Sequence, residues 1–310
     1  MNKKERVLAA LEGKRVDRPP VSVWYHFGTP FLGGRRIGEL EAEYFHAYDW
    51  DFLKMMNDFP WPLPEGMAQV ESAGDLDRFK TLTMEEPGIQ EQLNALSRAA
   101  ELVGPQAFVI DTVFNPFGVA RRTLKTRLMP FLREAPEKLR DWLSLCAENL
   151  SRYIRAAAKT GIGGIFFSVN GADRDTLTDE EFQRFVKPFD LTVLEAARSA
   201  GPLLVGHIHG KNLSMDRVLS YPVAALNWSH LHDNEGISRV RARTAKCLIG
   251  GMDEIATSQL TPPEIEDAVI TAARDARGGG FMAGPGCAIP SDIAADLILA
   301  ARRAVEKIKG

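Results

Sequence analysis

Two histidines separated by a single residue end an apolar run of the sequence. The stretch LLVGHIHGKN, residues 203–212, places His207 and His209 directly after four apolar residues. If this run is a strand, both side chains point to the same face, because alternate residues of a strand share a face. A lone histidine at a strand end is more often a packing residue, but two adjacent imidazoles are costly to bury unless a shared group holds them. A metal ion is the usual group of that kind, so the pair predicts a metal site.

One cysteine has the surroundings expected of a third ligand. Cys287 lies in GPGCAIP, residues 284–290, where glycines and prolines let the backbone bend and the thiol need not be buried. Neutral imidazole and thiolate suit zinc, and three protein ligands leave one position open for a substrate. Cys146, in an expected helix, and Cys247, at an expected strand start, are predicted to be small core residues. We therefore expect His207, His209 and Cys287 to bind Zn²⁺.

The elements that must position these residues follow a regular alternation. Short apolar runs rich in strand-forming residues alternate with longer amphipathic segments, which predicts a (β/α)8 TIM barrel formed as a single domain over residues 1–310. A doubly wound sheet is the competing fold, but HFGTPFLGG after the first run is a poor match to its glycine-rich phosphate turn. The expected strands are 20–27, 50–56, 107–113, 163–169, 202–208, 223–229, 246–252 and 279–285.

Two of the amphipathic segments carry clear end signals. Residues 136–161 end in Gly161, a good helix stop, and residues 177–201 begin with Thr178 followed by acidic residues. Threonine is a favourable N-cap, and the acidic residues suit the positive end of a helix dipole. Both segments are therefore expected to be helical.

Composition narrows the class of protein. The chain has 310 residues, is 45% hydrophobic and 25% charged, and has a net charge of −3, which gives no reason to expect binding to nucleic acid or to an anionic membrane surface. No apolar run reaches the roughly 18 residues that a membrane helix needs. The start of the sequence has no signal-peptide character, and three cysteines suit a reducing compartment. We expect a cytoplasmic protein.

Further polar residues fall at the expected strand ends, where barrel enzymes carry their chemistry. Five of the six histidines lie there, which packing alone explains poorly. HLHDN, residues 230–234, is equally compatible with a loop bonded to its own backbone. An amidohydrolase-type metal site is disfavoured, because that family carries its histidine pair on the first strand. The candidates beside the metal ligands are His26, Asn57, Asp58, Asn170, His230, His232 and Asp233.

An ordered set of segments resembles the uroporphyrinogen decarboxylase superfamily, which includes zinc-dependent, corrinoid-linked methyltransferases. KKERVLAALEGKRVDRPPVSVW is similar to the family's opening helix and first strand, and LTDEEFQRFVKPF to the segment after its fourth strand. LNWSHLHDNEGISRVRA resembles its sixth strand and following helix, and CLIGGMDE with GGFMAGPGCAIP its last two strands. The resemblance covers nearly the whole chain and implies the same barrel fold.

The two branches of the family differ where this sequence is informative. Decarboxylases carry an arginine-rich RQAGR stretch after the first strand, which binds the propionates of a tetrapyrrole; here that place reads YHFGTPFLGG. Asp58 matches the family's carboxylate at the end of strand two. The methyltransferase branch binds zinc through His-x-Cys on strand five and a cysteine after strand eight. His-x-His and Cys287 occupy those places, which implies a less thiolate-rich and more Lewis acidic metal.

The resemblance therefore predicts a zinc-dependent methyltransferase that moves a methyl group between a small methylated substrate or thiol and a corrinoid. No Asp-x-His-x-x-Gly signature occurs, so the corrinoid is expected on a separate protein. Asp58, His230 and His232 are expected to orient the substrate or move protons. Substrate-binding roles are expected for His26, Asn57, Asn170 and Asp233.

Two alternatives stay open at this point. The first is a metal-free tetrapyrrole decarboxylase whose anion clamp is rebuilt from Arg35, Arg36, Arg121 and Arg122. The second is a non-catalytic binding barrel, which retention of a full ligand set disfavours. A homodimeric assembly is also open, and neither nucleic acid nor a membrane is expected as a partner.

Overall fold

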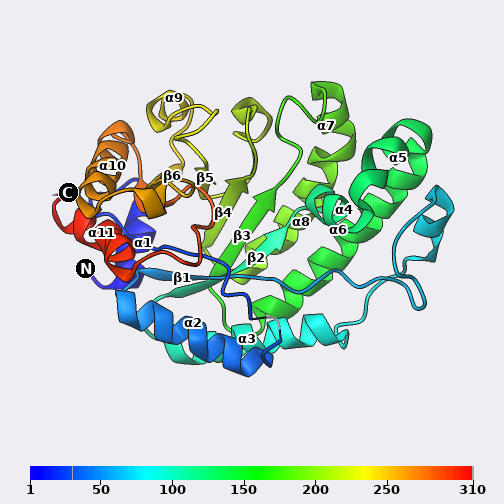
Figure 1. Ribbon diagram of the computed structural model, residues 1–310, viewed down its shortest axis with the longest axis horizontal. Helices are drawn as coiled ribbons and strands as arrows, with labels where there is room; N and C mark the ends of the chain where they lie inside the picture. The colour runs from blue at the N-terminus through cyan, green and yellow to red at the C-terminus, as the bar shows by residue number, and fades with distance from the viewer. Residues whose placement is uncertain (30, 309–310) are drawn as a thin grey trace.

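The computed structural model describes residues 1–29 and 31–308, and its centre is a curved sheet of parallel strands (Figure 1). The strands are hydrogen-bonded in the order in which they occur in the chain, β1 to β7. This single winding excludes the doubly wound sheet, in which the strand order reverses. The strands are β1 Phe52–Met55, β2 Phe108–Phe114, β3 Gly164–Val169, β4 Leu203–Ile208, β5 Ala225–Trp228, β6 Cys247–Met252 and β7 Phe281–Pro285.

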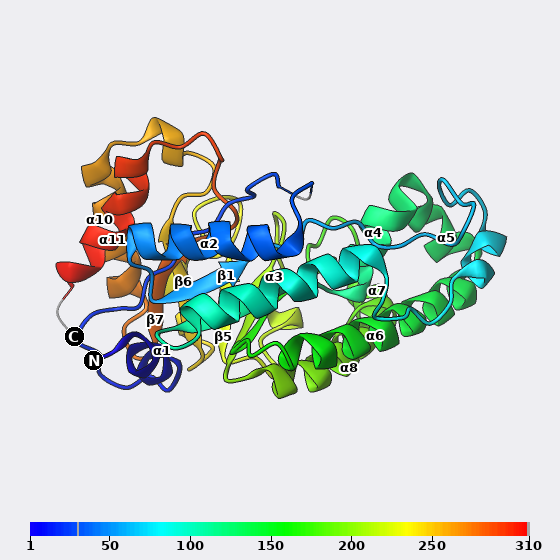
Figure 2. The same ribbon diagram turned by 90° about the horizontal axis from the view of Figure 1, so that it is seen from below.

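Helices connect the strands and cover the outer face of the sheet, with α2 and α3 lying side by side next to β1 (Figure 2). The α-helices are α1 Lys3–Leu11, α2 Gly34–Tyr48, α3 Pro87–Val103, α4 Pro116–Leu124, α5 Leu128–Glu134, α6 Pro136–Ala158, α7 Asp179–Phe185, α8 Lys187–Ala197, α9 Ile237–Arg241, α10 Pro262–Asp275 and α11 Ala295–Glu306. Short 3₁₀ helices are η1 Ala73–Arg78, η2 Lys125–Arg127, η3 Arg198–Ala200, η4 Met215–Arg217 and η5 Thr257–Gln259. Within the described residues, no helix is both long and apolar enough to cross a membrane.

The expected N-cap at Thr178 is confirmed, but the segment that follows it is divided. The Thr178 side chain accepts a hydrogen bond from the Glu181 N–H, and the Glu181 carboxylate accepts one from the Thr178 N–H. The helix then breaks at Val186, and α8 begins at Lys187 with Pro188 in its first turn. Proline has no N–H to continue the ladder of the preceding turn, so a second helix starts there.

The first expected strand, residues 20–27, is not a regular strand in the structure. This segment makes isolated bridges, from Val21 to Ala283 and from Tyr25 to Ile289. The N–H of Ser22 donates to the Ala283 carbonyl, and the N–H of Asp51 donates to the Val21 carbonyl. The segment thus lies between β7 and β1 and contacts both, but Pro20 has no N–H to donate to a ladder. The described sheet therefore has seven strands rather than the expected eight.

The interior of the curved sheet has its own apolar core, separate from the larger core between the sheet and the helices. Alternate residues along the strands fill it, as in Leu203 and Val205 of β4. Val7 and Ala10 of α1 close the end of this interior nearest the strand amino termini. His207 follows Leu203 and Val205 on the same face of β4. It therefore also faces the interior, near the carboxyl ends of the strands.

Candidate metal centre

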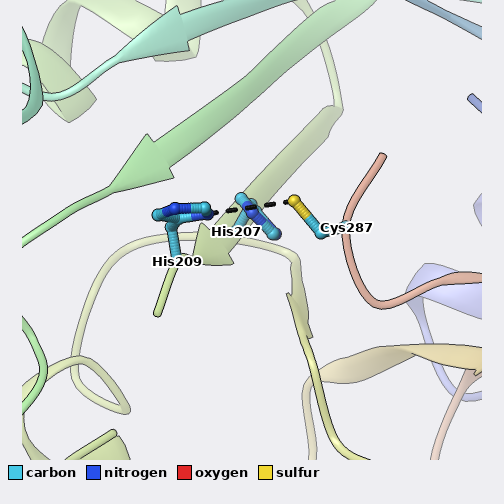
Figure 3. A group of neighbouring side chains, drawn as sticks. All are labelled: His207, His209 and Cys287. Atoms are coloured by element: carbon cyan, nitrogen blue, oxygen red, sulfur yellow. Dashed lines mark hydrogen bonds between the residues drawn. The ribbon is translucent and has the colours of Figure 1, made fainter. Parts of the chain in front are cut away.

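The two histidines and the cysteine singled out in the sequence meet at the carboxyl ends of the strands (Figure 3). One donor atom from each of His207, His209 and Cys287 lies within 4.8 Å of the others. The Cys287 Sγ and the His209 Nδ1 are 3.8 Å apart. In a tetrahedral zinc site, bonds of about 2.0 to 2.3 Å place ligand atoms roughly 3 to 4 Å from one another. Small side-chain adjustments would bring these donors onto one ion.

Backbone geometry explains why Cys287, far along the chain, reaches the histidines. The chain leaves β7 through Gly286, where a Cβ atom would lie 2.8 Å from the Ser229 Cα and 3.0 Å from the Trp228 carbonyl oxygen. Only glycine lets this segment pass so close to the end of β5. The thiol that follows is thereby held beside the end of β4, where both histidines lie.

Asn227 determines which nitrogen of His207 is available to a metal. The two residues are cross-strand partners in the pairing of β4 with β5. The Asn227 amide donates to the carbonyls of Ile249, at 3.1 Å, and Pro285, at 2.9 Å. Its Oδ1 therefore faces the His207 Nδ1, 2.7 Å away, and must accept the imidazole proton. The Nε2 atom of His207 is left unprotonated, with its lone pair free for a ligand bond.

Burial keeps this donor set neutral in the metal-free protein. It lowers the pKa of His207 to about 3, with a further lowering from His209, although the hydrogen bond to Asn227 acts the other way. Burial, followed by the charge of Arg121, lowers the pKa of His209. Burial raises the pKa of the Cys287 thiol. Imidazoles without a proton are ready to bind a cation, whereas the thiol must lose its proton on binding.

Ionisable side chains, most of them buried, gather on the opposite side of the sheet, on α2, on β1 and β2, and just after β1. We call Glu41, Lys54, Asp58 and Asp111 the charged side, and His207, His209, Cys287 and Asn227 the ligand side. Burial raises the pKa of Glu41 to about 8 and that of Asp111 to about 7, and it lowers the pKa of Lys54 to about 8. The Asp111 carboxylate accepts from Tyr153 and Gln92, so it faces the helices rather than the strand ends.

Two residues expected at the site form one pair. The His26 Nδ1 lies 2.7 Å from the Asp58 Oδ1 at the ends of the first segment and of β1. Partial burial raises the pKa of Asp58, but the hydrogen bond from His26 and the nearby positive charges outweigh it, and the net shift is downward. Asp58 is therefore a carboxylate at neutral pH. Asn57, by contrast, turns toward the Tyr153 hydroxyl and lines a pocket between β1, β2 and the helices.

The remaining expected residues have local partners. The His230 Nε2 accepts from the Gly251 N–H at 2.8 Å, and the ring packs against Gly250 of β6. The His232 Nε2 lies 2.8 Å from the Asp253 Oδ1, which also accepts two backbone N–H groups. These partners belong to β6 and the turn that follows it, not to the loop's own backbone. The proposed roles of His230 and His232 in proton transfer stay predictions.

Asn170 and Asp233 are also held by their neighbours. The Asn170 backbone exchanges two hydrogen bonds with the side chain of Asn115, and the residue is buried. Asp233 is exposed, has a positive φ of 44° and pairs with Lys211 at 3.5 Å. Neither has a hydrogen bond to His207, His209 or Cys287 in the described structure, and substrate binding by them stays a prediction.

Sequence reasoning overlooked two residues that the structure makes prominent. Asn227 is a polar residue in the otherwise apolar run ALNW of β5, which is a signal in the sequence. Its role follows only from its pairing with His207, which the structure shows. Lys54 lies in the apolar run FLKM of β1 and is only 4% exposed. Cys146 and Cys247 are buried, as expected for core residues.

The fold and the donor set together define a singly wound α/β protein with a candidate metal centre at its strand ends. Comparison with known proteins adds the family. A model of uroporphyrinogen decarboxylase (URO-D) matches residues 62–308, and the chain belongs to that family. The expectation drawn from the resemblance is confirmed at this level.

The similar proteins include methyltransferases. The methylcobamide:CoM methyltransferase MtbA of Methanosarcina mazei strain Goe1 is 22% identical over 227 residues, which are 72% of this chain and 65% of that protein. The alignment thus spans less than two thirds of the relative. A solved methyltransferase from Methanosarcina mazei has a TM-score of 0.79 at 19% identity and covers 99% of both chains. A vitamin-B12-independent methionine synthase from Listeria monocytogenes has a TM-score of 0.59 at 12% identity, over 89% and 87% of the chains. These likenesses show the fold.

Proposed function

We propose that the protein is a zinc-dependent methyltransferase of the URO-D family. The methyl group would move between a small methylated substrate or thiol and a corrinoid carried on a separate protein. The convergence of His207, His209 and Cys287 at the strand ends carries this proposal. The methylcobamide:CoM methyltransferase similar to this chain supports the reaction class. We also propose that residues 1–310 act as one domain, closed by the segment between β7 and β1.

The residues present fit a zinc ion. His207 offers an unprotonated Nε2 because Asn227 accepts the proton of Nδ1. His209 and Cys287 offer a nitrogen and a sulfur 3.8 Å apart. Two imidazoles and one thiolate leave a fourth position of a tetrahedral ion open. When bound, zinc would polarise a methylated substrate or lower the pKa of a substrate thiol.

The chain's own residues would orient the substrate around this centre. Asp58 is a carboxylate already paired with His26, so the pair can accept a hydrogen bond or a positive charge from a substrate. The interior rings Trp24 and Phe166, 5.3 Å apart, form an apolar floor below the histidines. Such a floor excludes water from the reacting atoms, which strengthens electrostatic interactions there.

Two of the four arginines of the alternative tetrapyrrole clamp form ion pairs on α2, whereas the charge of Arg121 reaches His209. Arg35 pairs with Glu39 at 3.8 Å, and Arg36 lies 3.3 Å from the same carboxylate, all on α2. Arg35 and Arg36 are thus engaged by their own helix. We therefore expect no turnover of uroporphyrinogen near the roughly 1 to 10³ s⁻¹ typical of enzymes.

The decisive experiment combines metal content with methyl transfer. Protein purified without a histidine tag or added metal should contain about one zinc per chain, bound by the His/His/Cys set. The same preparation should demethylate a methylcorrinoid in the presence of a small thiol, and a chelator should abolish the reaction. Metal-free protein with full methyl transfer, or fast uroporphyrinogen decarboxylation, would contradict the proposal.

A further inference from the structure

A pocket beside the end of β2 shares no residue with the candidate metal centre. It lies between β2 and helices α3, α4 and α6, and residues of the segment after β1 complete its wall. Figure 2 shows α3 and α6 next to each other on this side of the sheet. The described residues that line the pocket include none of the three proposed metal ligands. Its apolar wall is formed by Phe59, Trp61, Ile89, Phe114, Val119 and Leu150.

The size of the pocket suits a small organic molecule. Its volume is about 80 Å³. One water needs about 10 to 15 Å³ on the same measure, so the space holds roughly six waters, or a molecule of about eight non-hydrogen atoms. A six-membered ring with one or two substituents has this size, whereas a corrinoid is far too large to enter.

Two features hold the wall in place before any ligand binds. Trp61 lies between two prolines, whose rings fix φ near −65° and limit the movement of this segment. The Asn149 side chain of α6 accepts from the Leu82 N–H at 2.9 Å and donates to the Lys80 carbonyl at 3.2 Å. A pocket that is already formed loses little conformational freedom when a ligand enters.

One polar group of the pocket lacks a hydrogen-bond donor. Gln92 of α3 lines the pocket and is 2% exposed. Its amide nitrogen donates to the Met56 carbonyl at 3.1 Å and to the Asp111 Oδ1 at 2.9 Å. A backbone carbonyl only accepts, so the nitrogen is fixed there, and the Gln92 Oε1 has no partner among the described residues. A buried amide oxygen without a donor costs free energy, which the hydroxyl or N–H of a ligand would recover.

The neighbouring groups favour a donor without charge. The Tyr153 hydroxyl, also in the pocket wall, donates to the Asp111 Oδ2 at 2.6 Å. Its oxygen receives only a long hydrogen bond, 3.5 Å, from Asn57. An anionic ligand would face these acceptor oxygens and the Asp111 carboxyl. A cationic ligand would face Arg122, which lines the pocket 4.4 Å from the Phe114 ring centre and forms no ion pair with a described residue.

We propose that this pocket is a second ligand site, which binds a small uncharged ring compound that carries a hydroxyl or N–H group, such as a phenol. The apolar wall would bury the ring, and the oxygens of Gln92 and Tyr153 would accept the hydrogen bond of the ligand. A concave apolar site with few polar groups has the usual form of a small-molecule site. The inference is independent of the proposed function, because no proposed metal ligand lines the pocket.

Isothermal titration calorimetry with four probes of similar size tests the ligand class. 4-Cresol is an uncharged donor, 4-fluorotoluene has the same shape without a donor, benzoate is an anion and benzylamine is a cation. The protein should bind 4-cresol about 3- to 10-fold more tightly than 4-fluorotoluene, as the net effect of one neutral hydrogen bond implies. Both charged probes should bind more weakly than 4-fluorotoluene. Equal binding of the two neutral probes, or tightest binding of a charged one, would overturn the proposal without any variant.

Three variants test where the probes bind. Ile89→Trp fills the pocket from the first turn of α3 and should weaken binding of every probe more than about 10-fold, because a close-packed site leaves no room for a ring. Leu102→Trp makes the same change at a part-buried position near the other end of the same helix, and it should keep the wild-type affinities. Gln92→Met should reduce the affinity for 4-cresol to that for 4-fluorotoluene.

A chelator separates this site from the metal centre, where a phenol could bind as a ligand of the ion. Chelator-treated protein should bind 4-cresol as tightly as untreated protein. Loss of 4-cresol binding after chelation, or unchanged binding by Ile89→Trp, would show that the ring lies elsewhere and would overturn the inference. Protein that contains no zinc but keeps the wild-type order of probes would contradict the proposed function alone.

Discussion

The ligand side and the charged side of the strand ends differ in how far their buried polar groups have hydrogen-bond partners. On the ligand side, Asn227 donates to two backbone carbonyls and accepts the proton of His207, so this imidazole is neutral and oriented. On the charged side, Glu41 and Lys54 lie buried without pairing with each other. In the first arrangement the polar groups around His207 have partners before any metal binds. The second is incomplete, because one oxygen of Glu41 has no partner among the described residues and Lys54 donates only to the sulfur of Met56. Unpaired buried polar groups cost free energy.

The two sides also respond to pH with opposite signs. Burial lowers the pKa of His207 to about 3, so the metal-free folded chain loses stability as pH falls from the ordinary 6.5. Burial raises the pKa of Glu41 to about 8 from 4.5, so the folded chain loses stability as pH rises across that window. His207 thus lowers the stability of the folded chain as pH falls below 6.5, and Glu41 lowers it as pH rises from 4.5 to about 8.

Removing a ligand should give the largest effect. We expect Cys287→Ser or His207→Ala to lower zinc affinity more than about 100-fold, because two remaining donors hold the ion poorly. The fold should persist, since barrel stability comes mainly from packed layers away from the strand ends. Competition with a metallochromic chelator measures the affinity, and Cys146→Ser, a change to a buried helical cysteine, is the control. If both ligand variants keep wild-type zinc and activity, the ligand side is not a metal centre.

Changing the residue that orients His207 should give the next largest effect. Asn227→Asp can still accept the His207 proton but cannot donate to the Ile249 and Pro285 carbonyls. Asn227→Ala loses all three hydrogen bonds. We expect zinc affinity to fall about 10- to 100-fold in the alanine variant, as for other groups that orient a ligand. Leaving the carbonyls unpaired should also cost about 1 to 3 kcal/mol in both variants.

A matched control separates lost stability from lost orientation. Asn115→Ala removes a buried amide that caps α4 and bonds to Asn170 and Asp190. It should cost about 1 to 2 kcal/mol of unfolding free energy, as a lost N-cap does, with zinc affinity unchanged. Equal zinc affinity in Asn227→Ala and Asn115→Ala would show that the His207 tautomer is set elsewhere.

The charged side is tested by Glu41→Gln, which removes the ionisable proton with little change of shape. Because the wild-type carboxyl must ionise in a buried site as pH rises, the variant should gain stability relative to wild type between pH 5 and pH 8, by about 1 to 3 kcal/mol. Urea unfolding at both pH values measures the difference. Glu43→Gln, on the exposed face of the same helix, should show almost no pH-dependent difference. A pH-independent effect of Glu41→Gln would contradict the buried-carboxyl explanation.

The smallest change in metal binding is expected for His209→Cys. A thiolate replaces a neutral nitrogen in a similar place, so zinc should be retained with an affinity within about tenfold of wild type. Methyl transfer should change instead, because the added thiolate donates charge and weakens the metal as a Lewis acid. His209→Ala should lose metal. Full zinc content and activity in the alanine variant would move the search for a ligand to His230, His232 and Asp58.

Much of the fold was predictable because each element has a local cause. Seven of the expected strands occur within two residues of their expected bounds, since buried parallel strands appear in the sequence as short apolar runs. The first run did not become a regular strand: Pro20 lacks an N–H donor, and the two bridges of the segment, at Val21 and Tyr25, are isolated from each other. The histidine pair was found because alternation along one strand is a property of the sequence itself.

The amino-acid sequence was sufficient to predict the single winding of the chain, the shared face of His207 and His209, and the glycine- and proline-rich turn that carries Cys287. It could not determine which side chains meet across strands, because register is decided by packing of the whole sheet. Only the tertiary structure set Asn227 beside His207, turned Asp111 toward the helices and brought the Lys54 ammonium under the ring that stacks on His207. Those three outcomes depend on residues far apart in the chain, and burial, which shifts their pKa values, exists only once the fold has closed around them.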